Sequence, residues 1–156
     1  MSKSIRIFDK DVLNRMDGTK HLMFRNFSCR DSGQYKSTYP NFNIVITDEC
    51  ADYLREAGFN VVDYPDIDGN TMHRLKINVR FDNIPPMVFK KCGNKNVELK
   101  EDTIADLDRD EIVGINLWIN LSSKGACYLS KGIFEIVEDD FYKILYQDEM
   151  ESDYID

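Results

Sequence analysis

The chain has 156 residues, about the size of one ordinary globular domain and too short for two. With 42% hydrophobic, 12% aromatic and 31% charged residues, it can build a core and has a composition typical of soluble proteins. Its apolar runs fall well short of the roughly 20 residues that a membrane-spanning helix needs, so no membrane partner is expected. The first residues show no apolar export signal. We therefore expect a cytoplasmic protein whose four cysteines are reduced, two or three of them buried.

The net charge of −8 is unevenly distributed along the chain. Residues 1–46 carry eight basic and four acidic side chains, whereas residues 138–156 carry eight acidic side chains and only Lys143 as a cation. A second acidic segment, 101–111, has six acidic residues against Arg109. This asymmetry favours an acidic tail attached to a body with a basic face, although a soluble acidic protein with chance clustering fits the charge count equally well.

Alternating polar and apolar residues predict strands along most of the chain. A helix with Thr47 or Asp48 as its N-cap is expected in the first half, and one or two helical turns over 102–107 in the second. The two longest strands are joined by a hairpin at 122–125. The expected strands are 42–46, 60–64, 72–81, 87–91, 97–100, 111–121 and 126–137.

These elements predict a mainly β fold (α+β by count), in the form of an OB-like antiparallel barrel of about five to seven strands with one or two short helices. Only one segment makes a convincing crossover helix, which argues against parallel βαβ units. We expect a single domain over residues 1–147, followed by a disordered acidic tail over residues 148–156.

The strand over 112–121 places a tryptophan on its polar face. Its odd positions, from Val113 to Leu121, are all apolar and predict the core side. The even positions then include Trp118, the only tryptophan, between Asn116 and Asn120. An indole on a polar face needs a cover, and stacked nucleic-acid bases are one candidate. A loop, the helix or a partner subunit could cover it equally well.

The strand over 72–81 carries a row of cations. Arg74, Lys76 and Arg80 alternate with apolar residues, and two residues of a strand rise by roughly 7 Å. Such a row can follow the phosphates of an extended nucleic-acid strand, although cationic outer faces are also common on solvent-facing strands. Together with Trp118, the row would supply both parts of a single-strand binding surface, a positive groove and a stacking platform.

The segment 25–40 interleaves cations and aromatic residues around Gly33 and Pro40, without a core periodicity. A loop of this kind could wrap a nucleic-acid strand, with rings stacked on bases and cations near phosphates. The alternative is that its rings pack the loop onto the body of the protein. The candidate binding residues in this segment are Arg25, Phe27, Arg30, Tyr35, Lys36 and Tyr39.

The end of the chain combines acidic residues with an apolar pair. Such an end is often solvated and functionally silent. It can also compete with the nucleic-acid backbone for a basic groove, and engage a partner protein once it is displaced. The candidate partner-binding residues of this tail are Asp153, Tyr154, Ile155 and Asp156.

Several short motifs between residues 20 and 146 form a recognisable set: Arg25-Asn26-Phe27-Ser28-x-Arg30, Gly33 with Tyr35, Asn41-Phe42-x-Ile44-x-Ile46, Gly58-Phe59-Asn60-Val61, Pro85-Pro86-x-Val88, Leu107-Asp108 and Tyr128-Leu129. The set resembles small single-stranded-DNA-binding proteins of tailed bacteriophages. The resemblance implies an OB-type fold and sequence-tolerant binding of single strands in phage replication or recombination, in the host cytoplasm. It also implies an acidic tail that contacts replication partners. Cys29 departs from it, because glycine is expected there.

Enzymatic constellations are scarce in the sequence. There is no P-loop, GxSxG or HExxH motif, and neither His21 nor His73 has a Cys or His at metal-ligand spacing. The acidic run over 106–110 lacks the glycine and the glutamate of a calcium loop. Asp66 with the Glu-Leu-Lys of 98–100 faintly resembles a nuclease pattern, but the spacing is long. We therefore expect no catalytic activity, no cofactor and no metal.

The leading hypothesis is a non-enzymatic protein that binds single-stranded DNA over Trp118 and the cationic row. The alternative is an acidic phage protein that inhibits a host defence enzyme by imitating nucleic acid, with residues 101–111 and the tail as its active surface. A Mg²⁺-dependent nuclease is the third hypothesis. The sequence predicts neither an oligomeric state nor a preference between DNA and RNA.

Overall fold

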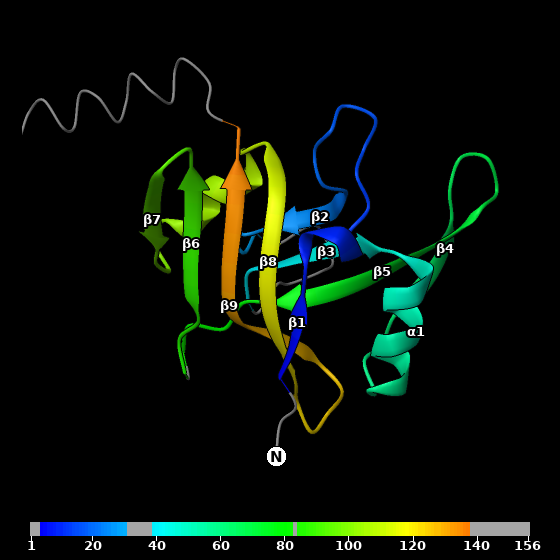
Figure 1. Cartoon of the computed structure of the whole chain (residues 1–156). Helices are drawn as coiled ribbons and strands as arrows, with labels where there is room; N and C mark the ends of the chain where they lie inside the picture. Colours follow the sequence, from blue (N-terminus) through cyan, green and yellow to red (C-terminus); the bar gives the residue numbers. More distant parts are fainter. Residues whose placement is uncertain (1–3, 31–38, 83, 138–156) are drawn as a thin grey trace, which may run out of the picture.

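The structure is a computed structural model that describes residues 4–30, 39–82 and 84–137. Within these residues the chain forms nine strands, one α-helix and two 3-10 helices (Figure 1). No helix in the described part of the chain is long and apolar enough to cross a membrane. The elements are β1 (Ser4–Ile7), η1 (Asp9–Asp11), β2 (Leu22–Asn26), β3 (Asn41–Ile46), α1 (Asp48–Glu56), β4 (Val62–Pro65), β5 (Thr71–Asn78), β6 (Met87–Cys92), β7 (Lys95–Leu99), η2 (Ile104–Asp108), β8 (Ile112–Leu121) and β9 (Cys127–Ile136).

All seven predicted strands are present, with boundaries shifted by a few residues at most. The helix α1 has Thr47 as its N-cap, because the Thr47 hydroxyl accepts a hydrogen bond from the backbone N–H of Cys50 at 3.2 Å. The additional strands are β1 and β2. β1 has only four residues, and a register shift between Met23 and Asn26 of β2 interrupts the alternation by which a strand is recognised.

The nine strands belong to one mixed sheet. Its main path runs β1-β8-β9-β5-β3-β2, while β4 pairs with β5, and β6 pairs with both β9 and β7. Most neighbours are antiparallel, but β5 and β6 run parallel to β9. The strands at the two ends of the path, β1 and β2, are not paired with each other in the described part of the chain, so the sheet is not closed.

The fold is therefore mainly β, as predicted, but the described strands do not form the predicted antiparallel OB-like barrel of five to seven strands. The sheet differs from the predicted barrel because of the pairing of β9. One edge of β9 pairs with β8, and two different strands pair with parts of its other edge. Tyr128 pairs with β5, and Lys131–Glu135 pair with β6. Alternation along the chain predicts which segments are strands, but it does not encode parallel pairs between distant segments.

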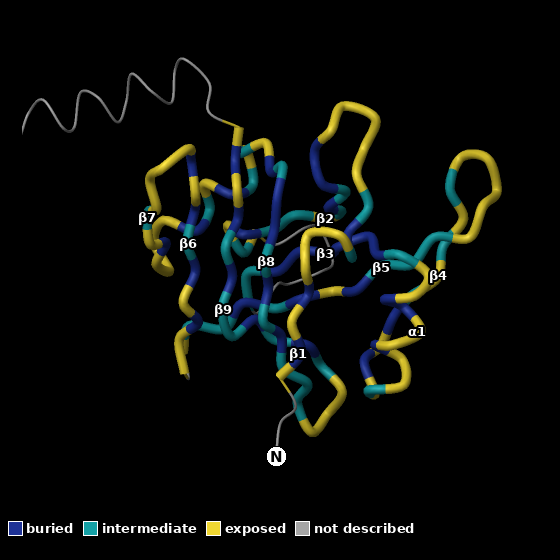
Figure 2. Tube along the Cα trace, in the orientation of Figure 1, coloured by how far each residue is buried: buried dark blue, intermediate teal, exposed yellow. Residues whose placement is uncertain are grey.

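The sheet folds over one hydrophobic core (Figure 2). In Figure 1, β6, β9 and β8 stand side by side in front of β2, β3 and β5. Three fully buried rings meet in the core, since Phe27 lies 4.9 Å from Phe42 and 5.8 Å from Phe134 between ring centroids. Cys50, Cys92 and Cys127 are also buried, which confirms the prediction that two or three cysteines lie inside.

Alternating burial defines a second side of the sheet, which we call the outer face because it lies opposite the core. On β5, Leu75 and Ile77 are buried while Lys76 between them is exposed. On β8, Leu117 and Ile119 are buried while Trp118 is half-buried. Near the start of β8 the predicted alternation fails, because a register shift between residues 112 and 114 leaves Val113 only half-buried and buries the residue before it.

Candidate nucleic-acid interface

Trp118 lies on the outer face between two cations. The strand register places Arg6 of β1 opposite Trp118 on one side and Lys131 of β9 on the other. The Cζ atom of Arg6 lies 4.5 Å from the indole centroid, and the Nζ atom of Lys131 lies 4.9 Å from it. The Arg6 Nε–H also donates a hydrogen bond to the Asn116 Oδ1 atom at 2.9 Å, which fixes the guanidinium beside the ring. The half-buried indole is thus flanked by positive charge.

A second aromatic cluster lies where β9 meets β5. The rings of Tyr39 and Tyr128 meet edge to face, with their centroids 6.2 Å apart. The Cζ atom of Arg80 lies 5.4 Å from the Tyr39 centroid. The Arg80 Nε–H donates to an oxygen of Asp82 at 2.7 Å, so part of this positive charge is already paired. The cluster therefore offers aromatic surface more than positive charge.

The cationic residues Arg74 and Lys76 lie on the outer face of β5. Lys76 is exposed, and Arg74 is half-buried. The Arg74 Nη1–H donates to the side-chain oxygen of buried Asn43 at 2.8 Å, and its Cζ atom lies 5.3 Å from the ring centroid of Phe24. Two members of the predicted row thus lie on this face, and Arg74 contacts an aromatic ring from another strand. The third member, Arg80, lies beyond the end of β5.

The strand register joins these groups into one face. Asn120 lies two residues after Trp118 and pairs with Tyr128, which in turn pairs with Asn78, two residues after Lys76. In β9, Ser130 is an extra residue between the partners of Trp118 and Ile119, and such bulges bend a strand. The outer face is therefore continuous but turns between the front and rear parts of the sheet (Figure 1).

Two predicted binding residues, Phe27 and Arg25, make contacts within the fold. Phe27 is 1% exposed and packs in the core, so its ring is not accessible to a base, and its assignment to the interface is wrong. Arg25 is half-buried, and its Nη1 atom donates to the carbonyl oxygens of Leu107 and Asp110 at 3.1 and 2.6 Å. Arg25 thus connects β2 to the segment around η2, and its contact with nucleic acid stays a prediction.

The other predicted residues of this segment differ in position. Arg30 has a 69% exposed side chain, 3.9 Å from the carboxylate of Asp108. Cys29 has a φ of +55°, a conformation that glycine adopts most easily, which accounts for the glycine expected there. Tyr35 and Lys36 lie outside the described residues, as do the four candidate residues of the tail, Asp153, Tyr154, Ile155 and Asp156.

The sequence patterns do not identify four residues of this candidate interface. Arg6 lies on β1, a strand too short to be predicted, and Lys131 changes face because of the bulge at Ser130. Tyr128 lies between β8 and β5 on this face only because it pairs with residues of both strands, which are distant in sequence. Phe24 is 64% exposed because of a local backbone conformation that its sequence does not signal.

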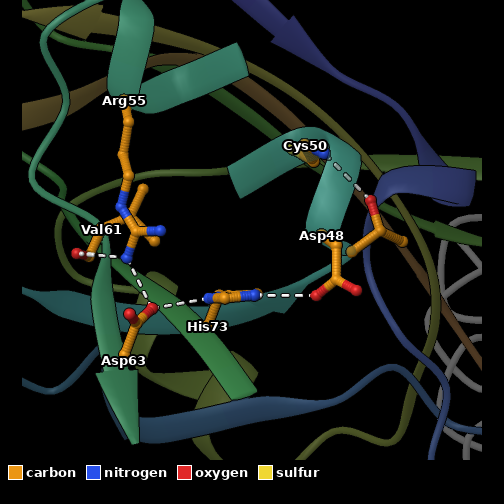
Figure 3. A network of polar contacts seen from close by, with 7 residues as sticks. Asp48, Cys50, Arg55, Val61, Asp63 and His73 are labelled. Atoms are coloured by element: carbon orange, nitrogen blue, oxygen red, sulfur yellow. Dashed lines mark hydrogen bonds and ion pairs between the residues drawn. The ribbon is translucent and has the colours of Figure 1, made fainter. Parts of the chain in front are cut away.

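A polar network ties α1 to the β4–β5 hairpin (Figure 3). Nδ1 of His73 lies 2.6 Å from an oxygen of Asp63, and Nε2 lies 2.8 Å from an oxygen of Asp48. Arg55 also donates to Asp63 and to the carbonyl oxygen of Val61. The hydrogen bond to Asp63 raises the pKa of His73 most, and the hydrogen bond to Asp48 also raises it, while burial acts in the opposite direction. This network stabilises the fold and lies on the core side of β5, away from the outer face.

The sequence matches the family model described as "Putative phage ssDNA-binding domain" over residues 3–156. The chain belongs to this family. The resemblance to phage single-stranded-DNA-binding proteins is thereby confirmed, and single-stranded DNA is the partner that the family assignment supports. No curated protein and no solved structure matches the chain.

In this phage ssDNA-binding domain, some carboxylates of the acidic segment 101–111 already accept hydrogen bonds from other parts of the fold. The Asp108 carboxylate accepts hydrogen bonds from the backbone N–H groups of Phe27 and Ser28 at 2.7 and 3.1 Å. The Asp110 carboxylate accepts one from the buried Lys90 at 2.9 Å. Within the described ranges, no group of three or more His, Cys, Asp or Glu side chains is placed to hold a metal ion.

Proposed function

We propose that this protein binds single-stranded DNA along the outer face of its sheet, without sequence specificity and without catalysing a reaction or holding a cofactor. It would act in phage DNA replication or recombination in the host cytoplasm. The observation that carries the proposal is the half-buried Trp118 ring between Arg6 and Lys131, at 4.5 and 4.9 Å. Membership of the phage ssDNA-binding family supports the choice of ligand.

The geometry around Trp118 suits both parts of a nucleotide. A base that takes the place of Arg6 or Lys131 over the indole gains roughly 1–3 kcal/mol from stacking, and every base has a flat face to stack. The phosphates on either side of that base need cations, and Arg6 and Lys131 flank the ring on two neighbouring strands. Because no base-edge recognition is required, binding by this arrangement tolerates any sequence.

The bound DNA strand would continue from Trp118 toward β5. Tyr128 and Tyr39 lie next along the outer face and add aromatic surface, with Arg80 beside them. Exposed Lys76 follows on β5 and can contact a phosphate. The path crosses the bend of β9, so the bound strand would wrap around the sheet.

The acidic tail has a separate proposed role. Asp153, Tyr154, Ile155 and Asp156 would compete with DNA for the cationic residues and contact replication or recombination proteins when DNA displaces them. The alternative function, inhibition of a host defence enzyme by an acidic surface, is less well supported. Asp108 and Asp110 of its proposed surface already bond within the fold.

Intrinsic fluorescence tests the proposed function directly, because Trp118 is the only tryptophan. Titration with oligo-dT at low salt should quench its emission, and added salt should weaken binding steeply. In an anisotropy assay with labelled oligo-dT, Trp118→Ala should bind roughly 5- to 100-fold more weakly. Tyr53→Ala is the matched control, since Tyr53 is 60% exposed on α1, outside the proposed interface. Unchanged emission at saturating oligomer would overturn the proposal.

A further inference from the structure

Phe24 is an exposed aromatic ring held by an unusual backbone conformation. It is 64% exposed, and its φ is +51°, in the left-handed region that bulky residues rarely occupy. It lies within the register shift of β2 between Met23 and Asn26. Bulges of this kind redirect a side chain, and strained residues concentrate at functional sites. A strained backbone conformation thus holds an apolar ring in solvent. A ligand that covers this ring would remove its apolar surface from water.

One guanidinium group lies beside this ring, and a second lies at the carbonyl group two residues before it. Arg74 lies 5.3 Å from the Phe24 centroid and is oriented by its hydrogen bond to Asn43. Arg15, in the loop between η1 and β2, is exposed, and its Nη2 atom donates to the carbonyl oxygen of Leu22 at 2.8 Å. No carboxylate among the described residues lies within ion-pairing distance of either guanidinium, although each spends one N–H on a protein acceptor.

Tyr64 completes the group with an unsatisfied hydroxyl. Its hydroxyl oxygen is buried and has no hydrogen-bond partner in the described part of the chain. The strand register places Tyr64 opposite Met72, two residues from Arg74 on the same face. Burial raises the pKa of the Tyr64 hydroxyl, and the nearby Asp66 carboxylate adds to this effect, while Arg74 and Arg15 oppose it. A buried hydroxyl without a partner costs free energy that an acceptor oxygen would recover.

We propose that Phe24, Arg74, Arg15 and the Tyr64 hydroxyl form a second nucleotide subsite, where one base stacks on Phe24 and a phosphate accepts hydrogen bonds from the other three groups. This inference rests on the proposed function, because it extends the same bound strand. Guanidinium groups are suited to phosphate, and the hydroxyl donates to a phosphate oxygen. The ligand class is therefore a single-stranded polynucleotide long enough to reach both Trp118 and Phe24.

The two subsites lie at opposite ends of the outer face. The route from Trp118 runs two residues along β8, across two strand pairings at Asn120–Tyr128 and Tyr128–Asn78, and four residues along β5 to Arg74. At about 3.3 Å per residue and about 4.8 Å per strand, this route is about 30 Å along the sheet. A short oligomer at Trp118 would not reach Phe24, so the second subsite should matter only for longer strands.

The Phe24→Gly variant tests whether Phe24 binds DNA or only supports the fold. Glycine adopts a positive φ without strain, so this variant should unfold at the same or a higher denaturant concentration than the wild type. Its affinity for oligo-dT of about sixteen nucleotides should fall roughly 5- to 100-fold, while its affinity for an oligomer of about four nucleotides should stay unchanged. Arg15→Gln should lower the slope of log K against log salt by about 1 for the longer oligomer. Tyr53→Ala is the control in each assay.

The outcomes distinguish this subsite from the proposed function. If the wild type quenches and binds but Phe24→Gly retains full affinity for the longer oligomer, the second subsite is wrong and the Trp118 interface stands. Equal losses for both oligomer lengths would also overturn it, because Phe24 would then act at or through the Trp118 site. If the wild type binds neither oligomer, the proposed function and this inference both fail.

Discussion

The guanidinium of Arg6 lies over the indole ring of Trp118, with 4.5 Å between Cζ and the ring centroid, although the two residues lie more than a hundred positions apart in the chain. The contact exists because the edge strand β1 pairs with β8 in a register that places the two side chains opposite each other. Asn116 holds the guanidinium in place. A cation is thus already held at the Trp118 ring, and under the proposed function this reduces the entropy lost on binding.

Arg6→Gln should weaken binding of oligo-dT and reduce its salt dependence. One phosphate contact would be lost, so the slope of log K against log salt should fall by about 1. Fluorescence anisotropy at several salt concentrations measures both quantities. Arg109→Gln makes the same change of charge at an exposed position after η2 and should leave the slope unchanged. Identical slopes for the two variants would show that Arg6 contributes only to the overall charge.

Phe27→Ala should destabilise the protein strongly. Its ring is 1% exposed and contacts Phe42 and Phe134, and removal of a buried phenylalanine costs about 3–5 kcal/mol. Urea unfolding followed by circular dichroism measures the loss. The milder Phe27→Leu should remain folded and bind oligo-dT with wild-type affinity, since the ring does not reach the outer face. A stable Phe27→Leu protein with weakened binding would restore Phe27 to the interface.

His73 should make stability depend on pH near neutrality. When protonated, it can donate to Asp63 and Asp48 at once, whereas the neutral ring has a single N–H and loses one of these bonds. The pKa of His73 is raised above its ordinary 6.5 in the folded protein. The stabilisation is therefore fully present below about pH 6.5 and is lost as the pH rises through the raised pKa.

Thermal unfolding midpoints between about pH 6 and pH 9 test this expectation, since an unperturbed histidine titrates near pH 6.5. His73→Gln should remove the decline in midpoint at the upper end of this range. His21→Gln is the control, because burial lowers the pKa of His21, so its contribution falls with decreasing pH instead. The same decline in all three proteins would exclude His73 as its source.

Asp108→Asn should destabilise the contact between η2 and the residues that follow β2. The Asp108 carboxylate accepts hydrogen bonds from two backbone N–H groups and from the hydroxyl of Ser28, and an amide can replace only part of this acceptor capacity. We expect a loss of about 1–3 kcal/mol in the free energy of unfolding, measured in urea. Asp102→Asn, at an exposed position nearby, should change this free energy little. Equal effects of the two substitutions would contradict this role.

Periodicity in the sequence predicted seven of the nine described strands, all except β1 and β2, because alternation is a local property of a half-buried strand. It correctly placed Lys76 on the face opposite Leu75 and Ile77, and Trp118 opposite Leu117 and Ile119. The match of short motifs to phage ssDNA-binding proteins is also a property of the sequence alone, and the family model confirms it.

Tertiary structure decided which of these residues meet. Phe27 and Phe24 lie three positions apart in a similar sequence environment, yet one is 1% and the other 64% exposed, because a bulge redirects β2 between them. The pairing of β1 with β8 brings Arg6 to Trp118, and the parallel contact of β5 with β9 joins the cationic row to the indole. Side-chain periodicity determines the face of a strand, but only strand pairing across the whole chain determines the neighbours on that face.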